Sequence, residues 1–216
     1  KIQCFIFVIM NKSIILPVVL AGGKSNRFGE DKSIVKLGDK TLLEHTLSKL
    51  EKEFSEILIV SNNSKVKPSK NNICIIKDCI DGQLGPLVGV LSSMKWIIDN
   101  NKKYRWVATF PCDTPFFDIK IIKEFKEHAS LAKDLLYFIN SNNQRHNIFG
   151  LWSLELCKIL ENDIRLNNFR KVEKWADKIG VKSIDISHEK FDKFLNINTR
   201  EEYKIAEKNL DKINND

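Results

Sequence analysis

Short apolar runs alternate along this chain with amphipathic segments. The runs are rich in valine, isoleucine and leucine, which is typical of strands buried in a sheet, and they lie at residues 14–20, 57–60, 73–76, 106–110, 135–139 and 148–152. Between them, apolar residues recur every three or four positions, which predicts helices. The alternation predicts one α/β domain: a Rossmann-like, doubly wound, mostly parallel open sheet with helices on both faces.

Local signals predict where several of these elements begin and which residues they bury. Capping boxes at residues 41–44 and 199–202 predict two helix starts, and Asp118 is expected to cap another helix. A helix with Pro86 in its first turn is expected to bury Leu87, Val90, Leu91, Met94 and Ile98. The remaining predictions are a polar loop at 140–147, helices at about 153–161 and 168–178, a strand at 181–186 and an extended piece at 194–197. Because proline cannot donate to a sheet ladder, the regular part of the first strand is expected to begin at about Pro17.

The loop after the first strand has the composition of a phosphate-binding site. It reads Leu20-Ala-Gly-Gly-Lys-Ser-Asn-Arg-Phe-Gly-Glu-Asp-Lys32. Gly22 and Gly23 let the backbone approach a polyphosphate and turn amide groups toward it, while Arg27 and Lys32 offset its charge. The spacing is neither that of a P-loop nor that of the G-x-G-x-x-G dinucleotide motif. A plain turn with surface cations is the alternative.

Polar residues follow the next three strands as well. Asn62, Asp78 and Asp113 come soon after the strands that end near residues 60, 76 and 110. In open α/β sheets, ligands bind beyond the carboxyl ends of the strands. The sequence therefore predicts that these side chains gather around one ligand.

Asp113 is the candidate metal ligand, since it lies in Pro111-Cys-Asp-Thr-Pro115, where two prolines stiffen the turn. Mg²⁺ takes only one or two protein carboxylates and completes its shell with water and substrate phosphates, so one aspartate suffices. An Asx turn is the alternative role for Asp113. Lys32 is the candidate for stabilising charge on the transferring phosphate, with a solvated surface lysine as its alternative.

Composition narrows the class of partner. The 216 residues carry a net charge of +7, which favours anionic partners. The lysines form no long run of like charges and no aromatic-basic pattern, so neither nucleic acid nor a membrane is expected as a partner. Five cysteines without a C-x-x-C pair indicate a reducing compartment, hence a cytoplasmic protein.

The first residues raise the question of a signal peptide, because Lys1 precedes an apolar run. The run is too short to span a bilayer, and a polar stretch at residues 11–13 interrupts it. We expect Met10 to be the true start, residues 1–9 to be an upstream extension or a disordered N-terminus, and residues 10–216 to be the domain.

Four motifs together resemble those of the molybdenum cofactor guanylyltransferases (MobA) within the nucleotidyltransferase superfamily. They are the loop at 20–32, Gly85-Pro-Leu-Val-Gly89, Pro111-Cys-Asp-Thr-Pro115 and Phe194-Leu-Asn-Ile-Asn-Thr199. The resemblance implies a magnesium ligand at Asp113, catalytic roles for Arg27, Lys32 and Asp113, and a nucleotide site at Leu20, Ala21, Gly22, Gly23, Lys32, Asn62, Asp78, Gly85, Pro86, Gly89 and Asp113. It also implies pterin-substrate contacts at Arg170, Asn196 and Asn198.

The chain departs from the family pattern at two positions. Val88 replaces the usual alanine of the second motif, and Asn147-Ile148 follows His146 where the family has Pro-Thr, which puts a substrate role for that strand in doubt. Asp78 is expected beside the nucleotide, with guanine and ribose both open as its partner. On residue pattern alone, the alternative for residues 85–89 is that they only form a helix N-terminus, and the alternative for Asn196 and Asn198 is that they are only turn residues before the capping box.

The activity implied by the resemblance is transfer of GMP from GTP to the terminal phosphate of Mo-molybdopterin, with Mg²⁺ and release of pyrophosphate. Proteins that deliver or receive the cofactor are a further class of partner. One alternative is a related nucleotidyltransferase that uses CTP on the same pterin, or another NTP on a sugar or alcohol phosphate. An alternative of another class is a non-catalytic protein that binds nucleotides or nucleic acid, with a steep salt dependence.

Overall fold

The computed structural model describes residues 13–22, 32–68, 70–82, 84–186 and 192–213. Within them, seven strands form one sheet in the order β5-β4-β1-β6-β8-β7-β9. Every neighbouring pair is parallel except the two that involve β8. The strands are β1 (Ile15–Leu20), β4 (Ile57–Val60), β5 (Ile73–Ile76), β6 (Trp106–Pro111), β7 (Leu136–Ser141), β8 (Gln144–Ser153) and β9 (Lys182–Asp185). A separate two-stranded hairpin, β2 (Lys36–Leu37) with β3 (Lys40–Thr41), was not anticipated from the sequence.

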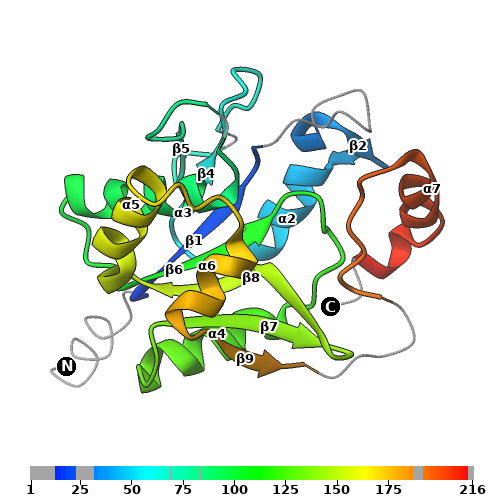
Figure 1. The fold of residues 1–216 in the computed structure, drawn as a ribbon. Coiled ribbons are helices and arrows are strands. Elements are labelled where there is room, and N and C mark those ends of the chain that lie inside the picture. Colours follow the sequence, from blue (N-terminus) through cyan, green and yellow to red (C-terminus); the bar gives the residue numbers. More distant parts are fainter. Residues whose placement is uncertain (1–12, 23–31, 69, 83, 187–191, 214–216) are drawn as a thin grey trace, which may run out of the picture.

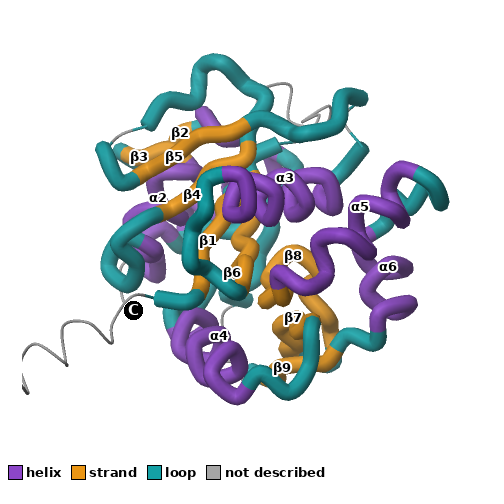
Figure 2. The backbone as a smooth tube through the Cα atoms, turned by 90° about the vertical axis from the view of Figure 1, so that its left-hand side faces the viewer, coloured by secondary structure: helices purple, strands orange, loops and turns teal. Residues whose placement is uncertain are grey.

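Helices cover both faces of the sheet (Figures 1 and 2). On one face lie α2 (Leu42–Leu50) and α4 (Lys120–Leu131), and on the other lie α3 (Pro86–Asp99), α5 (Cys157–Arg165) and α6 (Val172–Ile179). The last helix, α7 (Arg200–Lys208), lies beside β2. This three-layer arrangement confirms the predicted fold class. No helix of the described segments is both long and apolar enough to cross a membrane.

The two faces bury separate apolar clusters because side chains alternate along each strand. Val19, Phe110 and Leu151 pack with α2 and α4, whereas Val18, Val107 and Trp152 pack with the helices of the other face. A third cluster lies to one side, beneath α7, and consists of Val35, Leu37, Leu42, Phe116, Ile197 and Ala206.

Pro17 lies inside β1 rather than at its start, and the sheet accommodates it. The amide of Ala21 donates to the carbonyl of Val60 in β4 (3.0 Å). Backbone amides alternate in direction along a strand, so the nitrogen of Pro17, four residues earlier, also points toward β4. The β1–β4 ladder begins only at Val18, opposite Leu58. The missing N–H of Pro17 therefore points to a position just before β4 begins, and no ladder bond is lost.

Three predictions about single segments were wrong. Residues 140–147 are not a loop, because they form the paired ends of β7 and β8 around a tight turn whose Asn142 and Asn143 have φ of 51° and 62°. In α3 the last core-facing residue is Ile97 (1% exposed) rather than Ile98 (51% exposed), because three residues after Met94 the helix has turned that position inward. Residues 194–197 form no strand, although Ile197 is buried as expected.

Other boundaries were close. Asp118 accepts a hydrogen bond from the amide of Lys120 at the start of α4 (2.8 Å), and both capping boxes are formed. The helix expected at 153–161 begins as a 3-10 turn at Leu154–Leu156, capped by Ser153, and continues as α5 from Cys157. The helix expected at 168–178 begins four residues later, at Val172.

Candidate active site

The carboxyl ends of β1 and β6 lie side by side and bring two of the predicted site residues together. Leu20 and Pro111 are paired in the ladder, so Gly22 and Asp113 both lie two residues beyond neighbouring strand ends, which are about 4.8 Å apart in a sheet. Gly22 is exposed, and among the described residues other than its chain neighbours, no heavy atom lies within 4 Å of the place where a Cβ would stand. Gly23 and Arg27, from the same loop, lie outside the described residues.

Ala21 and Leu20 are held in place by the strands on either side. The amide of Ala21 donates to Val60, and its carbonyl accepts a hydrogen bond from the Ser61 hydroxyl (3.2 Å). The carbonyl of Leu20 accepts from the amide of Cys112 (3.4 Å). The end of β1 is therefore fixed on both sides just before Gly22.

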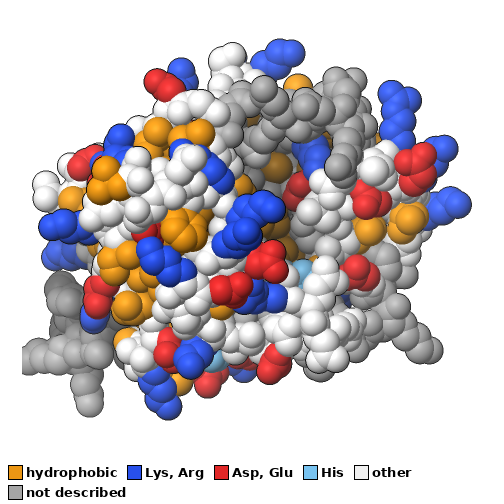
Figure 3. Space-filling model, viewed as in Figure 1, with side chains coloured by type: hydrophobic (Ala, Val, Ile, Leu, Met, Phe, Trp, Pro, Cys, Tyr) orange, Lys and Arg blue, Asp and Glu red, His pale blue; other side chains and the backbone are white. Residues whose placement is uncertain are grey.

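Three side chains from distant parts of the chain meet beyond the ends of β1 and β6: Lys32, Asp113 and Asn198. The Lys32 ammonium donates to Asp113 Oδ2 (2.8 Å) and to Asn198 Oδ1. The Lys32 and Asp113 side chains are 14% and 19% exposed, so the ion pair is largely shielded but open on one side. Figure 3 shows a hollow on this face of the molecule, between the α6 side and the α7 side, with basic side chains on its rim.

Backbone contacts hold these three residues. Lys32 begins a short 3-10 turn, Lys32–Ile34, which is tied to the start of α2 by a bond from the Leu42 amide to the Val35 carbonyl (2.9 Å). The amide of Ile197 donates to the carbonyl of Asp113 (2.8 Å), so the segment before α7 lies directly against the turn after β6. Asp113 contacts Lys32 through its side chain rather than forming only an Asx turn.

Asn62 and Asp78 form a second group at the ends of β4 and β5. The Asn62 side-chain amide donates to Asp78 Oδ2 (2.7 Å), and the Asp78 backbone amide donates to Asn62 Oδ1 (3.1 Å). Burial raises the pKa of the Asp78 carboxyl above its ordinary value, and the bond from Asn62 offsets part of that rise. This pair presents a half-buried carboxylate at the same edge of the sheet as Gly22.

Gly85 and Gly89 adjoin that pair from α3. Gly85 precedes the helix with φ of 89°, a value that side chains rarely adopt, and Pro86 occupies the first turn. A Cβ on Gly89 would stand 2.9 Å from Leu20 Cδ2 and 3.9 Å from Asp78 Oδ1. Glycine therefore allows α3 to pack directly against the end of β1 beside the Asp78 carboxylate.

Arg170 and Asn196 do not join the Lys32 group through any contact within the described residues. The Arg170 guanidinium donates to the carbonyl oxygens of Ile164 and Phe169 (2.9 and 2.7 Å). The Arg170 carbonyl oxygen lies 3.5 Å from where a Cβ on Gly85 would stand, so this loop borders the start of α3. Asn196 is exposed and, with Asn198, flanks the buried Ile197.

Two features of the site were missed from the sequence. Glu202 accepts hydrogen bonds not only within its capping box but also from the amide of Asn198 (2.7 Å). His146 stacks on Phe194, with ring centroids 3.8 Å apart, and its Nε2 lies 2.7 Å from the Ser141 hydroxyl. The capping box was a usable signal for Glu202, whereas no local pattern links His146 to a residue 48 positions away.

The donors at this site suit a magnesium ion that arrives with a nucleotide. Among the described residues, no three His, Cys, Asp or Glu side chains lie close enough together to hold a metal by themselves. Mg²⁺ needs only one or two carboxylates when phosphate oxygens and water complete its shell. Asp113, two residues beyond the end of β6 and next to the end of β1, fits that role.

Comparison with known proteins identifies the family of this chain. The family model described as a MobA-like NTP transferase domain matches residues 17–179. This chain belongs to the MobA-like NTP transferase family. It is a nucleotidyltransferase, as its sequence motifs predicted.

Curated relatives agree with that assignment, and a solved structure shares the fold. A protein of Rhizobium rhizogenes named molybdenum cofactor guanylyltransferase is 29% identical over 89% of this chain and 90% of its own length. One of the same name from Nitrobacter hamburgensis is 27% identical over 88% of this chain and 92% of its own length. The crystal structure of molybdopterin-guanine dinucleotide biosynthesis protein A from Archaeoglobus fulgidus superimposes with a TM-score of 0.73 at 22% identity, over 91% of this chain and 98% of that one. The last likeness concerns the fold alone.

Proposed function

We propose that this nucleotidyltransferase transfers GMP from GTP to the terminal phosphate of Mo-molybdopterin, with Mg²⁺, and releases pyrophosphate. The observation that carries the proposal is the Lys32–Asp113–Asn198 group beside the Gly22 turn, at the carboxyl end of the sheet. It supplies one cation, one carboxylate and a polyphosphate-accessible backbone within a single site. The names of the curated relatives support guanine and the molybdenum cofactor as the substrates.

The reaction is an in-line displacement at the α-phosphorus. A phosphate oxygen of the acceptor forms the new P–O bond while the bond to the pyrophosphate oxygen breaks, and the electron pair leaves with pyrophosphate. The second pKa of a phosphate monoester is about 6, so the nucleophile is already ionised at neutral pH. The chain therefore needs no general base.

Lys32 stabilises the charge that develops on the α-phosphate. Its ammonium is held between Asp113 and Asn198 before the substrate binds, so it does not have to be reoriented during the reaction. Asp113 is the residue that would hold Mg²⁺, and a bound Mg²⁺ supplies charge neutralisation between the two phosphate-bearing substrates. Asn196 and Asn198, with Arg170 nearby in the fold's C-terminal half, are the residues proposed to contact the pterin substrate.

Asp78 supports guanine as the base. A carboxylate accepts hydrogen bonds from the N–H groups on the Watson–Crick edge of guanine, whereas adenine would leave it facing an acceptor. The bond from Asn62 holds this carboxylate in one orientation. The same pair is also placed to meet a ribose hydroxyl, and the base preference of an Asp78→Asn variant distinguishes the two roles.

The test is pyrophosphate release from each of the four NTPs, with Mg²⁺ and purified molybdopterin cofactor, for the wild type and Asp113→Ala. We expect release with GTP alone, only when the pterin is present, and its loss in Asp113→Ala. Asp99→Ala is the matched control, because Asp99 is an exposed aspartate at the end of α3. Release with CTP in place of GTP would make the protein a cytidylyltransferase and remove the role given to Asp78. GTP binding without release on any acceptor would favour a binding protein.

A further inference from the structure

Glu202, at the start of α7, makes one hydrogen bond more than a capping box requires. In the box, the Thr199 hydroxyl accepts from the Glu202 amide (3.2 Å), and Glu202 Oε2 accepts from the Thr199 amide (2.8 Å). The same Oε2 atom also accepts from the amide of Asn198 (2.7 Å). One half-buried carboxylate oxygen therefore fixes two consecutive backbone amides.

The additional bond reaches the active site through Asn198. The Asn198 side chain accepts from the Lys32 ammonium, which in turn donates to Asp113. A lysine ammonium is a point charge on a flexible four-carbon stem, so its position depends on the acceptors that hold it. Glu202 thus fixes the backbone of the residue that holds the cation, without touching the cation.

Apolar packing joins the same segments beneath the polar group. The third cluster contains Val35, Phe116 and Ile197, each within three residues of Lys32, Asp113 or Asn198. Ala206, one helical turn after Glu202, is buried in this cluster. The Tyr203 hydroxyl donates to the carbonyl of Lys36 (2.8 Å), which ties α7 to β2.

We propose that Glu202 is a positioning residue of the active site, which acts through Asn198 to hold the Lys32 ammonium against Asp113. This inference rests on the proposed function, because it assigns Lys32 to the transferring phosphate. Glu202 is distinct from an ordinary helix cap in one respect: its removal displaces a substrate-contacting cation as well as shortening the helix.

The test separates positioning from helix stability with two variants of the same capping box. Thr199→Ala removes the hydroxyl that caps the helix but leaves the bond from the Asn198 amide to Glu202, whereas Glu202→Ala removes that bond. Both are expected to lower the melting temperature by similar amounts. We expect kcat to fall about ten- to hundredfold in Glu202→Ala, the range found when residues that support ligands are removed, with a far smaller change in Thr199→Ala.

Two further variants and one spectroscopic signal complete the experiment. Glu202→Gln is expected to restore most of kcat, because both bonds converge on one oxygen and an amide oxygen can replace it. Glu201→Ala is the matched control, since Glu201 is an exposed glutamate in the same turn. In ¹H–¹⁵N spectra, the Asn198 amide resonance should shift in Glu202→Ala and keep its position in Thr199→Ala.

The outcomes distinguish this inference from the proposed function. A wild type that releases pyrophosphate from GTP, with equal losses of kcat in Glu202→Ala and Thr199→Ala, overturns the inference alone. An unshifted Asn198 resonance in Glu202→Ala overturns it as well. A wild type without turnover on GTP refutes the proposed function, and this inference with it.

Discussion

Replacing Lys32 by alanine is the most direct perturbation of the site. It removes the one cation, among the described side chains, that contacts Asp113, and it leaves Asn198 Oδ1 without that donor. The two acceptors remain partly open to water, since the Asp113 side chain is 19% exposed. The variant therefore tests catalysis with limited damage to the fold.

The magnitudes expected for stability and for catalysis differ. Removing one partner costs at most about 1 kcal/mol for an exposed ion pair and about 3–5 kcal/mol for a buried one. Because the Lys32 and Asp113 side chains are only 14% and 19% exposed, the free energy of unfolding should fall by an amount between these limits. Loss of a preorganised group that stabilises transition-state charge costs about 10²- to 10³-fold in kcat, or about 3–4 kcal/mol. The two losses are therefore measured separately, the first by urea unfolding and the second by kcat.

A double-mutant cycle on pyrophosphate release checks this reasoning, with urea titration of each variant alongside. Because Asn198 holds the Lys32 ammonium, the Asn198→Ala change should lower kcat less once Lys32 is alanine, a coupling of about 0.5–3 kcal/mol. Its proposed contact with the pterin should instead raise KM for the pterin in both backgrounds. Lys36→Ala is the control, as an exposed lysine four residues away. Additive effects of the two changes on kcat would refute the coupling between Asn198 and Lys32, and a kcat for Lys32→Ala within a few-fold of the wild type would refute the role given to Lys32.

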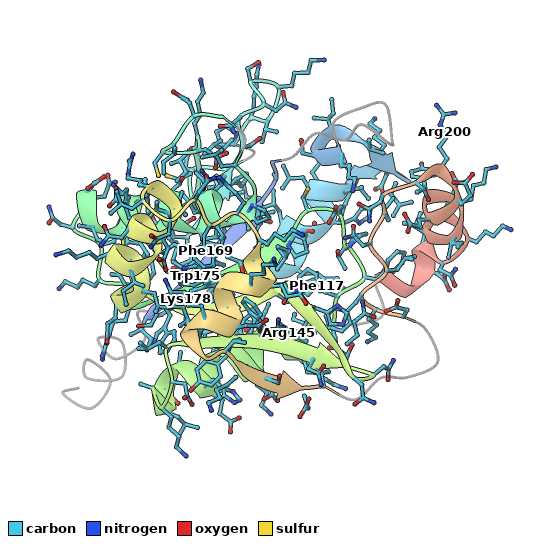
Figure 4. All side chains as sticks on the ribbon, viewed as in Figure 1. Phe117, Arg145, Phe169, Trp175, Lys178 and Arg200 are labelled. Atoms are coloured by element: carbon cyan, nitrogen blue, oxygen red, sulfur yellow. The ribbon has the colours of Figure 1, made fainter. Side chains whose placement is uncertain are left out.

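The remaining predictions concern packing and pH. A Cβ on Gly150 would stand 2.6 Å from ring atoms of both Phe138 and Trp152, well inside the roughly 3.5–4.0 Å of an ordinary contact. Gly150→Ala should therefore lower the free energy of unfolding, measured by urea titration, by about 1–3 kcal/mol. An unchanged free energy of unfolding would contradict this packing. The buried Asp163 of α5 accepts hydrogen bonds from two residues of α6, Trp175 (2.9 Å) and Lys178 (2.5 Å). Figure 4 labels both of these α6 residues. Burial alone would raise the pKa of the Asp163 carboxyl. The bonds from Lys178, Asn167 and Trp175 lower it by more than burial raises it, so that its pKa lies below the ordinary value. Its stabilisation is therefore present above pH 4 or so and lost as the pH falls through the lower native pKa, and Asp163→Asn should unfold with a weaker acid dependence. The effect of Asp78 on stability has the opposite pH dependence. Because its pKa is raised, the free energy of unfolding falls as the pH rises through that pKa. KM for GTP should rise as the pH falls through the same pKa, and Asp78→Asn should lose that pH dependence of KM.

Local pattern was a good guide to the elements and to the strand ends that bear the site. Apolar runs predicted the sheet strands because a buried parallel strand must be apolar on both faces. The capping boxes predicted the starts of α2 and α7 because the two reciprocal bonds of a box involve only four neighbouring residues. Asn62, Asp78 and Asp113 could be assigned to one edge of the sheet from strand direction alone.

The errors arose where a polar segment is held by its neighbours. Residues 140–147 lack apolar alternation, yet they pair as a hairpin because two consecutive asparagines accept the positive φ that a tight turn needs. That Asn-Asn pair was the available signal. Ile98 and Ile97 are adjacent, and only the packing of α3 on α5 and on the sheet decides which of them points inward.

The sequence by itself determined that this chain is an α/β nucleotidyltransferase with a carboxylate just beyond the end of β6, and it predicted a phosphate-binding loop after β1. Only the tertiary structure decided that Lys32 reaches across 81 residues to Asp113 and across 166 to Asn198, and that Glu202 holds the last of these in place. The physical reason is that helix caps and strand patterns depend on neighbours along the chain. A contact between three segments depends on the strand order and on the cluster of Val35, Phe116 and Ile197 that packs them together.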